Sequence, residues 1–321
     1  MPPAASSAAA KAASWPELPY GAWRDTCETL HLWTQVVGKV RLALTPWLNH
    51  SWHVTLYVTA RGLATPPMAV GGRDLAMEFD FIDHVLWLRT NDGHFRQVML
   101  QPMTVAAFYA DVMAALSELG IAVRIDEMPN EIPGAVRFSE DRVHASYDRD
   151  FANRFFRILL RSRDGFAHFR TAFLGKASPV HFFWGSFDLA VTRFSGRTAP
   201  PHPGGVPNLS DDVVREAYSH EVSSAGFWPG GGPIDYPAYY SYAYPAPEGF
   251  AQARVRPDAA FWSKELGEFI LPYDAVRTAT DPGAVLISFL QSTYDAAADL
   301  AKWDRAALEC TLGVPGKVRA V

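Results

Sequence analysis

The sequence has little cysteine, no long apolar run and no cluster of basic residues. Its only cysteines, Cys27 and Cys310, lie far apart, so it predicts neither a disulfide framework nor a thiolate metal site. Eighteen consecutive apolar residues occur nowhere, so no helix is expected to span a membrane. The net charge is −5, whereas a nucleic-acid partner requires a cationic surface. We therefore expect a cytoplasmic protein without a nucleic-acid or membrane partner.

Catalytic motifs of known mechanism are also missing. Ser186 lies in no Gly-x-Ser-x-Gly elbow, and the glycines at 230–232 lack the Lys and Ser/Thr of a phosphate loop. No His-Glu-x-x-His pair is present, so the sequence predicts no cofactor and no metal. If a metal were bound, the first ligands to consider would be His50, His53, His181 and His220.

The composition is that of a globular protein: 49% of the 321 residues are hydrophobic and 20% are charged. This length suits two domains or one unit of two fused halves. Residues 1–14 are small and polar and predict a disordered tail, and residues 314–321 form a second tail.

Hydrophobic spacing predicts the elements of the first half, residues 15–123. A helical period runs from Gly21 to Leu44, and the opposite stripe is polar, which favours a solvated face; it comprises Arg24, Glu28, His31, Gln35 and Lys39. Alternation over 52–58 predicts a strand. Two strands broken near 82–84, a further strand and a helix from Thr104 to Gly120 follow.

The second half, residues 148–313, repeats this order. After a surface connection at 124–147, a helix begins near Asp148. "FDLAVTRFSG" then resembles "VTLYVTARG", and a helix starting at Asp281 and Pro282 ends the unit. We expect an α+β protein of two similar antiparallel sheet-plus-helix halves, fused into one compact unit. The alternative is that antiparallel meanders closed by a helix look alike by chance.

Several segments together resemble a known family. These are "TLHLWTQVVGKVRLALTPWLNHSWHVTLYVTARGL", "HFFWGSFDLAVTRFSG", "GFWPG" and "FLQSTYDAAADLA". They resemble an uncharacterised bacterial family known as a domain of unknown function, over about residues 15–312. The resemblance implies no reaction, cofactor or site residue.

The stretch "SHEVSSAGFWPGGGPIDYPAYYSYAYP" is the first candidate site. Strand alternation places His220 and Trp228 on one face and Glu221 on the other. Tyr240, Tyr242 and Tyr244 also share a face, where they can wall a pocket or pack against a helix. The glycine run provides the freedom of a lid.

The stretch "HFFWGSFDLAV" is the second candidate. Treated as one strand, it places Trp184, Ser186 and Asp188 on one face. A carboxylate among aromatic side chains is desolvated, which raises its pKa toward that of a general acid or base. The alternative is that Asp188 only accepts hydrogen bonds from its neighbours. His181 and His53 are further candidates, the first catalytic and the second for ligand binding.

The sequence leaves three functional classes open. The first is a small-molecule-binding protein that acts as a cofactor-independent enzyme, with catalytic candidates His220, Asp188 and His181 and an aromatic pocket of Trp184, Trp228, Tyr240, Tyr242, Tyr244 and His53. The second is a non-catalytic carbohydrate- or metabolite-binding module. The third is a partner-docking protein, whose aromatic patch would be exposed and not concave.

Overall fold

The first half of the chain forms helices and an antiparallel sheet. The computed structural model describes residues 14–319, so residues 1–13 of the expected N-terminal tail and 320–321 of the second tail lie outside it. Helix α2 (Tyr20–Leu44) precedes β1 (Tyr57–Val58), β2 (Gly62–Ala64), β3 (Met68–Val70), β4 (Arg73–Asp80), β5 (Val85–Thr90), β6 (Phe95–Met99) and α3 (Val105–Glu118). The strand order is β1-β2-β4-β5-β6, with β3 beside β4. Thr104 caps α3 by accepting a hydrogen bond from the N–H of Ala107, so the predicted start of this helix is confirmed.

The second half is a six-stranded antiparallel sheet with the order β11-β12-β10-β9-β8-β7. Its elements are α4 (Arg149–Arg170), β7 (His181–Phe183), β8 (Asp188–Thr198), α5 (Asp211–Ala217), β9 (His220–Trp228), β10 (Ala238–Tyr244), β11 (Phe261–Ser263), β12 (Glu268–Pro272), α6 (Tyr273–Arg277), α7 (Pro282–Leu300) and α8 (Arg305–Leu308). Short 3-10 turns add η1 (Asn49–Ser51), η2 (Phe138–Glu140) and η3 (Phe250–Gln252). Both halves are antiparallel sheets with helices, and the α+β prediction is confirmed.

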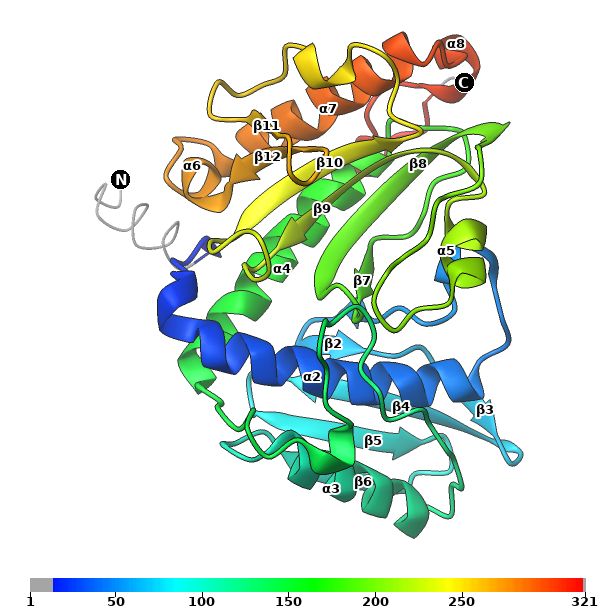
Figure 1. The fold of residues 1–321 in the computed structure, drawn as a ribbon, viewed down its shortest axis with the longest axis vertical. Helices are drawn as coiled ribbons and strands as arrows, with labels where there is room; N and C mark the ends of the chain where they lie inside the picture. The colour runs from blue at the N-terminus through cyan, green and yellow to red at the C-terminus, as the bar shows by residue number, and fades with distance from the viewer. Residues whose placement is uncertain (1–13, 320–321) are drawn as a thin grey trace.

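Helix α4 and one strand bridge join the halves. Leu56 and Phe182 exchange backbone hydrogen bonds of 2.9 and 2.8 Å, which connect β1 to β7. α4 runs from one sheet to the other (Figure 1): Asn153 near its start donates to the carbonyl of Phe81, and Ser162 pairs with the hydroxyl of Tyr239. One continuous hydrophobic core includes residues of both halves.

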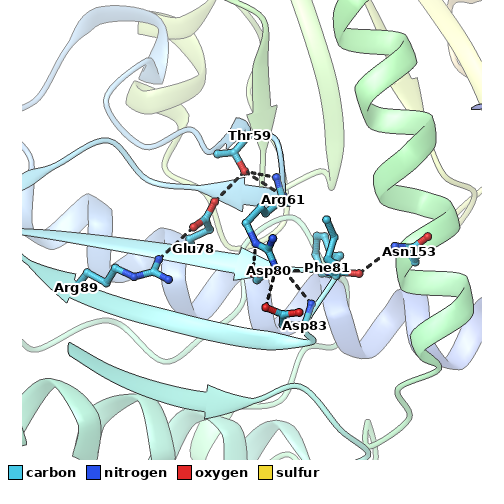
Figure 2. Close-up of polar contacts among 10 residues, drawn as sticks. Thr59, Arg61, Glu78, Asp80, Phe81, Asp83, Arg89 and Asn153 are labelled. Atoms are coloured by element: carbon cyan, nitrogen blue, oxygen red, sulfur yellow. Dashed lines mark hydrogen bonds and ion pairs between the residues drawn. The ribbon is translucent and has the colours of Figure 1, made fainter.

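An ion-pair network stabilises the turn between β4 and β5, beside the contact with α4 (Figure 2). Arg61 donates to Asp80 and to Asp83, and Asp80 also accepts the N–H groups of Ile82 and Asp83. Burial opposes the charged form of Asp80, but these hydrogen bonds outweigh it and hold the pKa of Asp80 below its usual value. The network orders the turn that receives Asn153.

The sequence-based repeat does not hold strand by strand. Residues 54–62 form the edge strand β1 and the turn into β2, whereas residues 187–196 enter β8, which has neighbours on both sides. The segments therefore occupy different positions in their sheets, and we attribute their likeness to the alternation that antiparallel meanders share. The predicted strand at 52–58 is shorter in the structure, because residues 52–54 form a turn after η1 and β1 starts only at Tyr57.

The polar stripe of α2 is a solvated face only at its start, where Arg24 and Glu28 are exposed. Gln35 and Lys39 are 0% and 3% exposed. Their polar atoms bind the connection at 124–147: Lys39 donates to the carbonyl of Met128, and Gln35 forms a two-way pair with the backbone of Asn130. Buried polar side chains are tolerated when they are hydrogen-bonded, as these are to the backbone of the connection. The same contact positions part of the candidate site.

Candidate functional site

A cavity of about 290 Å³ lies on the face of the second sheet opposite α4 and α7. Odd-numbered residues of β8 such as Leu189 and Val191 belong to the core, and even-numbered residues such as Ala190 and Thr192 face the cavity. The segment 206–217, which includes α5, contributes part of the cavity wall through Val206, Leu209, Val213, Val214 and Ala217. The side chains that line the cavity are His50, Ser51, Trp52, Glu131, Phe183, Ser186, Asp188, Ala190, Thr192, Phe194, Val206, Leu209, Val213, Val214, Ala217, Tyr218, Val222, Ser224, Trp228, Tyr240, Tyr242 and Glu268.

Asp188 is a buried and fixed carboxyl group in this cavity. It opens β8 and is 4% exposed. Ser186 Oγ donates to its Oδ1 over 2.6 Å, and the Tyr240 hydroxyl donates to its Oδ2. Burial raises the pKa of Asp188 to about 6, although both hydrogen bonds favour the anion. Asp188 is therefore mostly ionised at neutral pH, with a pKa in the range that suits a general base.

Glu131 enters the cavity from the connection between the halves. Its backbone has φ of 63°, in the left-handed region, and its N–H donates to the carbonyl of Pro207 over 2.8 Å. Its carboxyl lies so close to Gly185 that a Cβ there would overlap it. Burial and the nearby charge of Asp188 raise the pKa of Glu131 to about 7. The structure thus places a second carboxyl beside Asp188.

Glu268 on β12 supplies a third carboxyl. Burial, followed by the charge of Asp188, raises the pKa of Glu268 to about 8, so it is mostly protonated at neutral pH. Its Oε2 is buried and has no hydrogen-bond partner among the described residues. Three carboxyl groups therefore share one cavity, and their different pKa values separate an ionised group from a protonated one.

A row of hydroxyl groups lines the middle of the cavity. Thr192 Oγ1 lies 2.8 Å from Ser224 Oγ, and the hydroxyls of Tyr218 and Tyr242 lie 2.9 Å apart. Ser224 also hydrogen-bonds Tyr242, which connects the two pairs. Burial raises the pKa of Tyr218 to about 12, so this phenol is neutral at physiological pH. The row offers donors and acceptors to a polar ligand.

His50 lies at the other end of the cavity. Its Nδ1 donates to the carbonyl of Ala217 over 2.8 Å, and its Nε2 accepts from the Lys176 ammonium over 2.6 Å. Burial lowers the pKa of His50 below its usual value. These bonds fix a neutral imidazole, which contributes no positive charge to the cavity.

Four of the residues predicted from the sequence line the cavity together: Asp188, Trp228, Tyr240 and Tyr242. The indole of Trp228 and the phenol of Tyr240 are in contact, with ring centroids 4.6 Å apart. Sequence reasoning missed Glu131, Glu268 and Tyr218. Strand alternation could have indicated Glu268, which shares a face with Ile270 of β12, whereas nothing local marks Glu131.

The other five predicted residues, Trp184, His181, His53, Tyr244 and His220, do not line the cavity. Trp184 packs on Gly38 of α2 and donates its indole N–H to the carbonyl of Val54 over 2.7 Å. The reason is that residues 184–187 form a turn between β7 and β8, with Phe187 at φ of 59°, so strand alternation does not apply there. His181, His53 and Tyr244 are also absent from the lining. His181 bonds Thr55, His53 bonds the backbone of Leu48, and Tyr244 donates to Pro200.

The predicted pairing of His220 with Asp188 is wrong. Leu189 pairs with Phe227, which places Asp188 opposite Trp228, and His220 lies eight positions before Trp228 at the other end of β9. Eight steps along an extended strand span roughly 26 Å, too far for one small ligand. His220 instead lies beside His50, with ring centroids 5.8 Å apart. The predicted opposite orientation of Glu221 agrees with its ion pair to Arg197, outside the cavity lining.

Histidine, cysteine and acidic side chains form no group of three able to hold a metal ion within residues 14–319. In the same range no helix is both long and apolar enough to cross a membrane.

The comparisons with known proteins identify a family and no individual relative. Neither the curated proteins nor the solved structures contain a match to this chain. Residues 15–310 match one family across both sheets and every element of the cavity. The chain belongs to the family described as "Family of unknown function (DUF5996)".

Proposed function

We propose that this protein binds a small molecule in the cavity beside β8, β9 and β10 and transforms it by acid–base catalysis without a cofactor. The observation that carries the proposal is the fixed, buried carboxyl of Asp188 in a cavity walled by Trp52, Phe183 and Trp228. Ligand sites are typically concave, largely apolar and supplied with a few fixed polar groups. The cytoplasmic location remains part of the proposal, supported by two cysteines that form no disulfide.

The different pKa values of the cavity carboxyl groups suit them to different catalytic roles. Asp188, with a pKa of about 6, is the general base, because it is ionised at neutral pH and held in place by Ser186 and Tyr240. Glu268, with a pKa of about 8, is the general acid, because it retains its proton at the same pH. The proton would move from substrate to Asp188 and from Glu268 to the departing or newly charged atom. Glu131 lies near enough to Asp188 for their charges to interact.

Ligand retention and turnover test this proposal separately. Native mass spectrometry of the purified protein, followed by extraction and identification of the bound compound, should reveal a small molecule. Trp228→Ala should abolish its retention, because the indole forms a wall of the cavity. Asp188→Asn should retain the compound but lose turnover by at least about 100-fold, the usual contribution of a general base. Retention by Trp228→Ala at the wild-type level would contradict the placement of the site.

A non-catalytic binding module is the second candidate. The hydroxyl row of Thr192, Ser224, Tyr242 and Tyr218 favours it, since such groups can recognise a polar ligand without any chemistry. In that case Tyr242→Phe would weaken binding by about 0.5–1.5 kcal/mol, the net value of one hydrogen bond, and the ligand would be recovered unchanged after incubation with either wild type or Asp188→Asn. Unchanged recovery from wild type would favour the module over the enzyme.

A further inference from the structure

We propose that the ligand of this cavity is a small organic cation, such as a primary ammonium or guanidinium compound. The inference rests on the proposed function, because it assigns a ligand class to the same cavity. Three observations carry it: the balance of charge in the lining, an unpartnered carboxyl oxygen, and the aromatic walls.

The lining is acidic and contains no cationic side chain among the described residues. Glu131, Asp188 and Glu268 line the cavity, and no lysine or arginine of the described chain does so. His50 is the basic side chain of the lining, and its hydrogen bonds to Ala217 and Lys176 keep it neutral. A cationic ligand would remove the repulsion among the carboxyl groups that Asp188 now exerts on both glutamates.

An unpartnered oxygen marks where the cation would be held. Glu268 Oε2 is buried and accepts no hydrogen bond within residues 14–319, in a side chain that lines the cavity. Buried polar atoms are normally satisfied, and an exception requires an explanation. An ammonium or guanidinium group provides the N–H donors that this carboxyl oxygen lacks here.

The aromatic side chains that wall the cavity also favour a cationic ligand. Trp228 and Phe183 face the cavity with Asp188, and ring faces attract cations. The opposite end already shows this preference: Lys176 Nζ lies 4.7 Å from the Phe194 ring centroid and 5.3 Å from that of Trp52. A ligand cation therefore belongs at the carboxyl end, where no side chain of the described protein supplies one.

An organic cation fits better than a metal ion. The acidic side chains of the described residues do not converge into a group able to coordinate a metal. The cavity volume of about 290 Å³ instead approaches the lower end of the range found for small-molecule sites.

The binding of matched fragments at several pH values tests the inference. Benzylamine, benzyl alcohol and benzoate have similar size and differ in charge. Calorimetric titration near pH 8 should show benzylamine binding at least about tenfold tighter than benzyl alcohol, because one desolvated ion pair typically supplies that difference. The preference should shrink toward pH 5, since Asp188, Glu131 and Glu268 take up protons as the pH falls through about 8 to 6.

The other titratable groups near the site should not produce this pH dependence. The phenols of Tyr218, Tyr240 and Tyr242 have pKa values raised by burial and stay neutral over this range. His31, behind Gly185, has its pKa lowered by burial to about 4. At the far end of the cavity, His50 hydrogen-bonds both Glu216 and Lys176. Any effect of their protonation on the shape of the cavity would change the affinity of benzyl alcohol as well as that of benzylamine.

Variants separate this inference from the proposed function. Glu268→Gln and Glu131→Gln should each reduce the advantage of benzylamine over benzyl alcohol, whereas Glu221→Gln, a carboxyl outside the lining, should leave it unchanged. If benzyl alcohol or benzoate binds wild type as tightly as benzylamine near pH 8, the cation inference is overturned and the small-molecule site stands. If no fragment binds at millimolar concentration, and no compound is retained by the purified protein, both proposals fail.

Discussion

The hydroxyl of Tyr240 on β10 reaches across β9 to donate a hydrogen bond to the carboxyl of Asp188 on β8. The path crosses Gly226, which pairs with Tyr240 on one side and with Ala190 on the other. A Cβ at Gly226 would overlap the Tyr240 hydroxyl. Gly226 therefore leaves room for the Tyr240 side chain to pass over β9. This lets Tyr240 hydrogen-bond Asp188, which lies two strands away.

Gly226→Ala should disturb this crossing. We expect the unfolding free energy to fall by about 1–3 kcal/mol, the usual cost of overpacking a close-packed position. Ligand binding should weaken, because Tyr240 and with it Asp188 must move. Chemical denaturation and fragment titration measure the two effects. Gly21→Ala is the control, since its Cβ would meet no atom within 4 Å and should change stability by no more than about 1 kcal/mol. Unaltered binding by Gly226→Ala would show that the crossing has no role in the site.

Tyr240→Phe and Tyr239→Phe are neighbouring changes on opposite faces of β10. Tyr240→Phe should raise the pKa of Asp188 above about 6, because a hydrogen bond to the anion is lost, and should shift the pH dependence of ligand binding upward. Tyr239→Phe removes a bond to Ser162 on the helix-covered face and should cost about 0.5–1.5 kcal/mol of stability without a shift in binding. Equal pH profiles for the two variants would contradict the role given to Tyr240.

The three cavity carboxyls should make the protein less stable at alkaline pH. Their folded pKa values of about 6, 7 and 8 exceed the ordinary values of 3.8 for Asp and 4.5 for Glu. Their contribution to stability is therefore complete below about pH 4 and is lost as the pH rises through 6 to 8. Glu268→Gln should raise the unfolding free energy at pH 8 by about 1–2 kcal/mol, a value reduced for screening by solvent in the cavity, and should change little near pH 5. Thermal denaturation at both pH values measures this, and a larger gain near pH 5 would refute it.

The buried histidines should make the protein less stable at acid pH. Burial lowers the pKa of His31 to about 4 and that of His181 to about 3, below the ordinary histidine value of 6.5. Their contribution to stability is present above about pH 6.5 and is lost as the pH falls toward 3. His181→Gln should accordingly make the acid limb of the stability profile shallower, even if it lowers stability at pH 7. An acid limb as steep as that of wild type would exclude His181 as a source of acid sensitivity.

Trp184→Phe should affect stability and not binding. Its indole N–H bonds the carbonyl of Val54, which the variant leaves without this partner. A cost of about 1–3 kcal/mol is expected. Fragment affinities should equal those of wild type, because Trp184 does not line the cavity. If the folded variant bound the fragments more weakly than wild type, Trp184 would have to be part of the binding site.

Asp80→Asn should weaken the network that orders the turn between β4 and β5. We expect a loss of about 1.5–3 kcal/mol, typical of hydrogen bonds to a charged group. Because the pKa of Asp80 is lowered, its contribution is present above about pH 4 and is lost as the pH falls further. Urea denaturation at pH 7 and pH 3 measures the difference. Glu118→Gln, which removes an exposed ion pair with Arg96, should cost less than about 1 kcal/mol.

The sequence by itself determined much of the secondary structure and one wall of the cavity. Thr104, Asp148 and Asp281 mark helix starts, because their side chains can accept the first free N–H groups of a helix. The period of two along β9 and β10 placed Trp228, Tyr240 and Tyr242 toward one side of their sheet. Both kinds of inference depend on neighbours within a few residues.

Only the tertiary structure decided which groups meet. The sequence predicts that the segment containing Glu131 is a surface connection. Glu131 reaches the cavity because the side chain of Gln35, 95 residues away, hydrogen-bonds the backbone of Asn130. Trp184 leaves the cavity because the chain turns at 184–187, and His220 lies far along β9 from Asp188. Local periodicity fixes the side of a strand on which a residue lies. It does not fix strand length, the position of a turn, or the contacts between distant segments, and these placed the three carboxyl groups in one cavity.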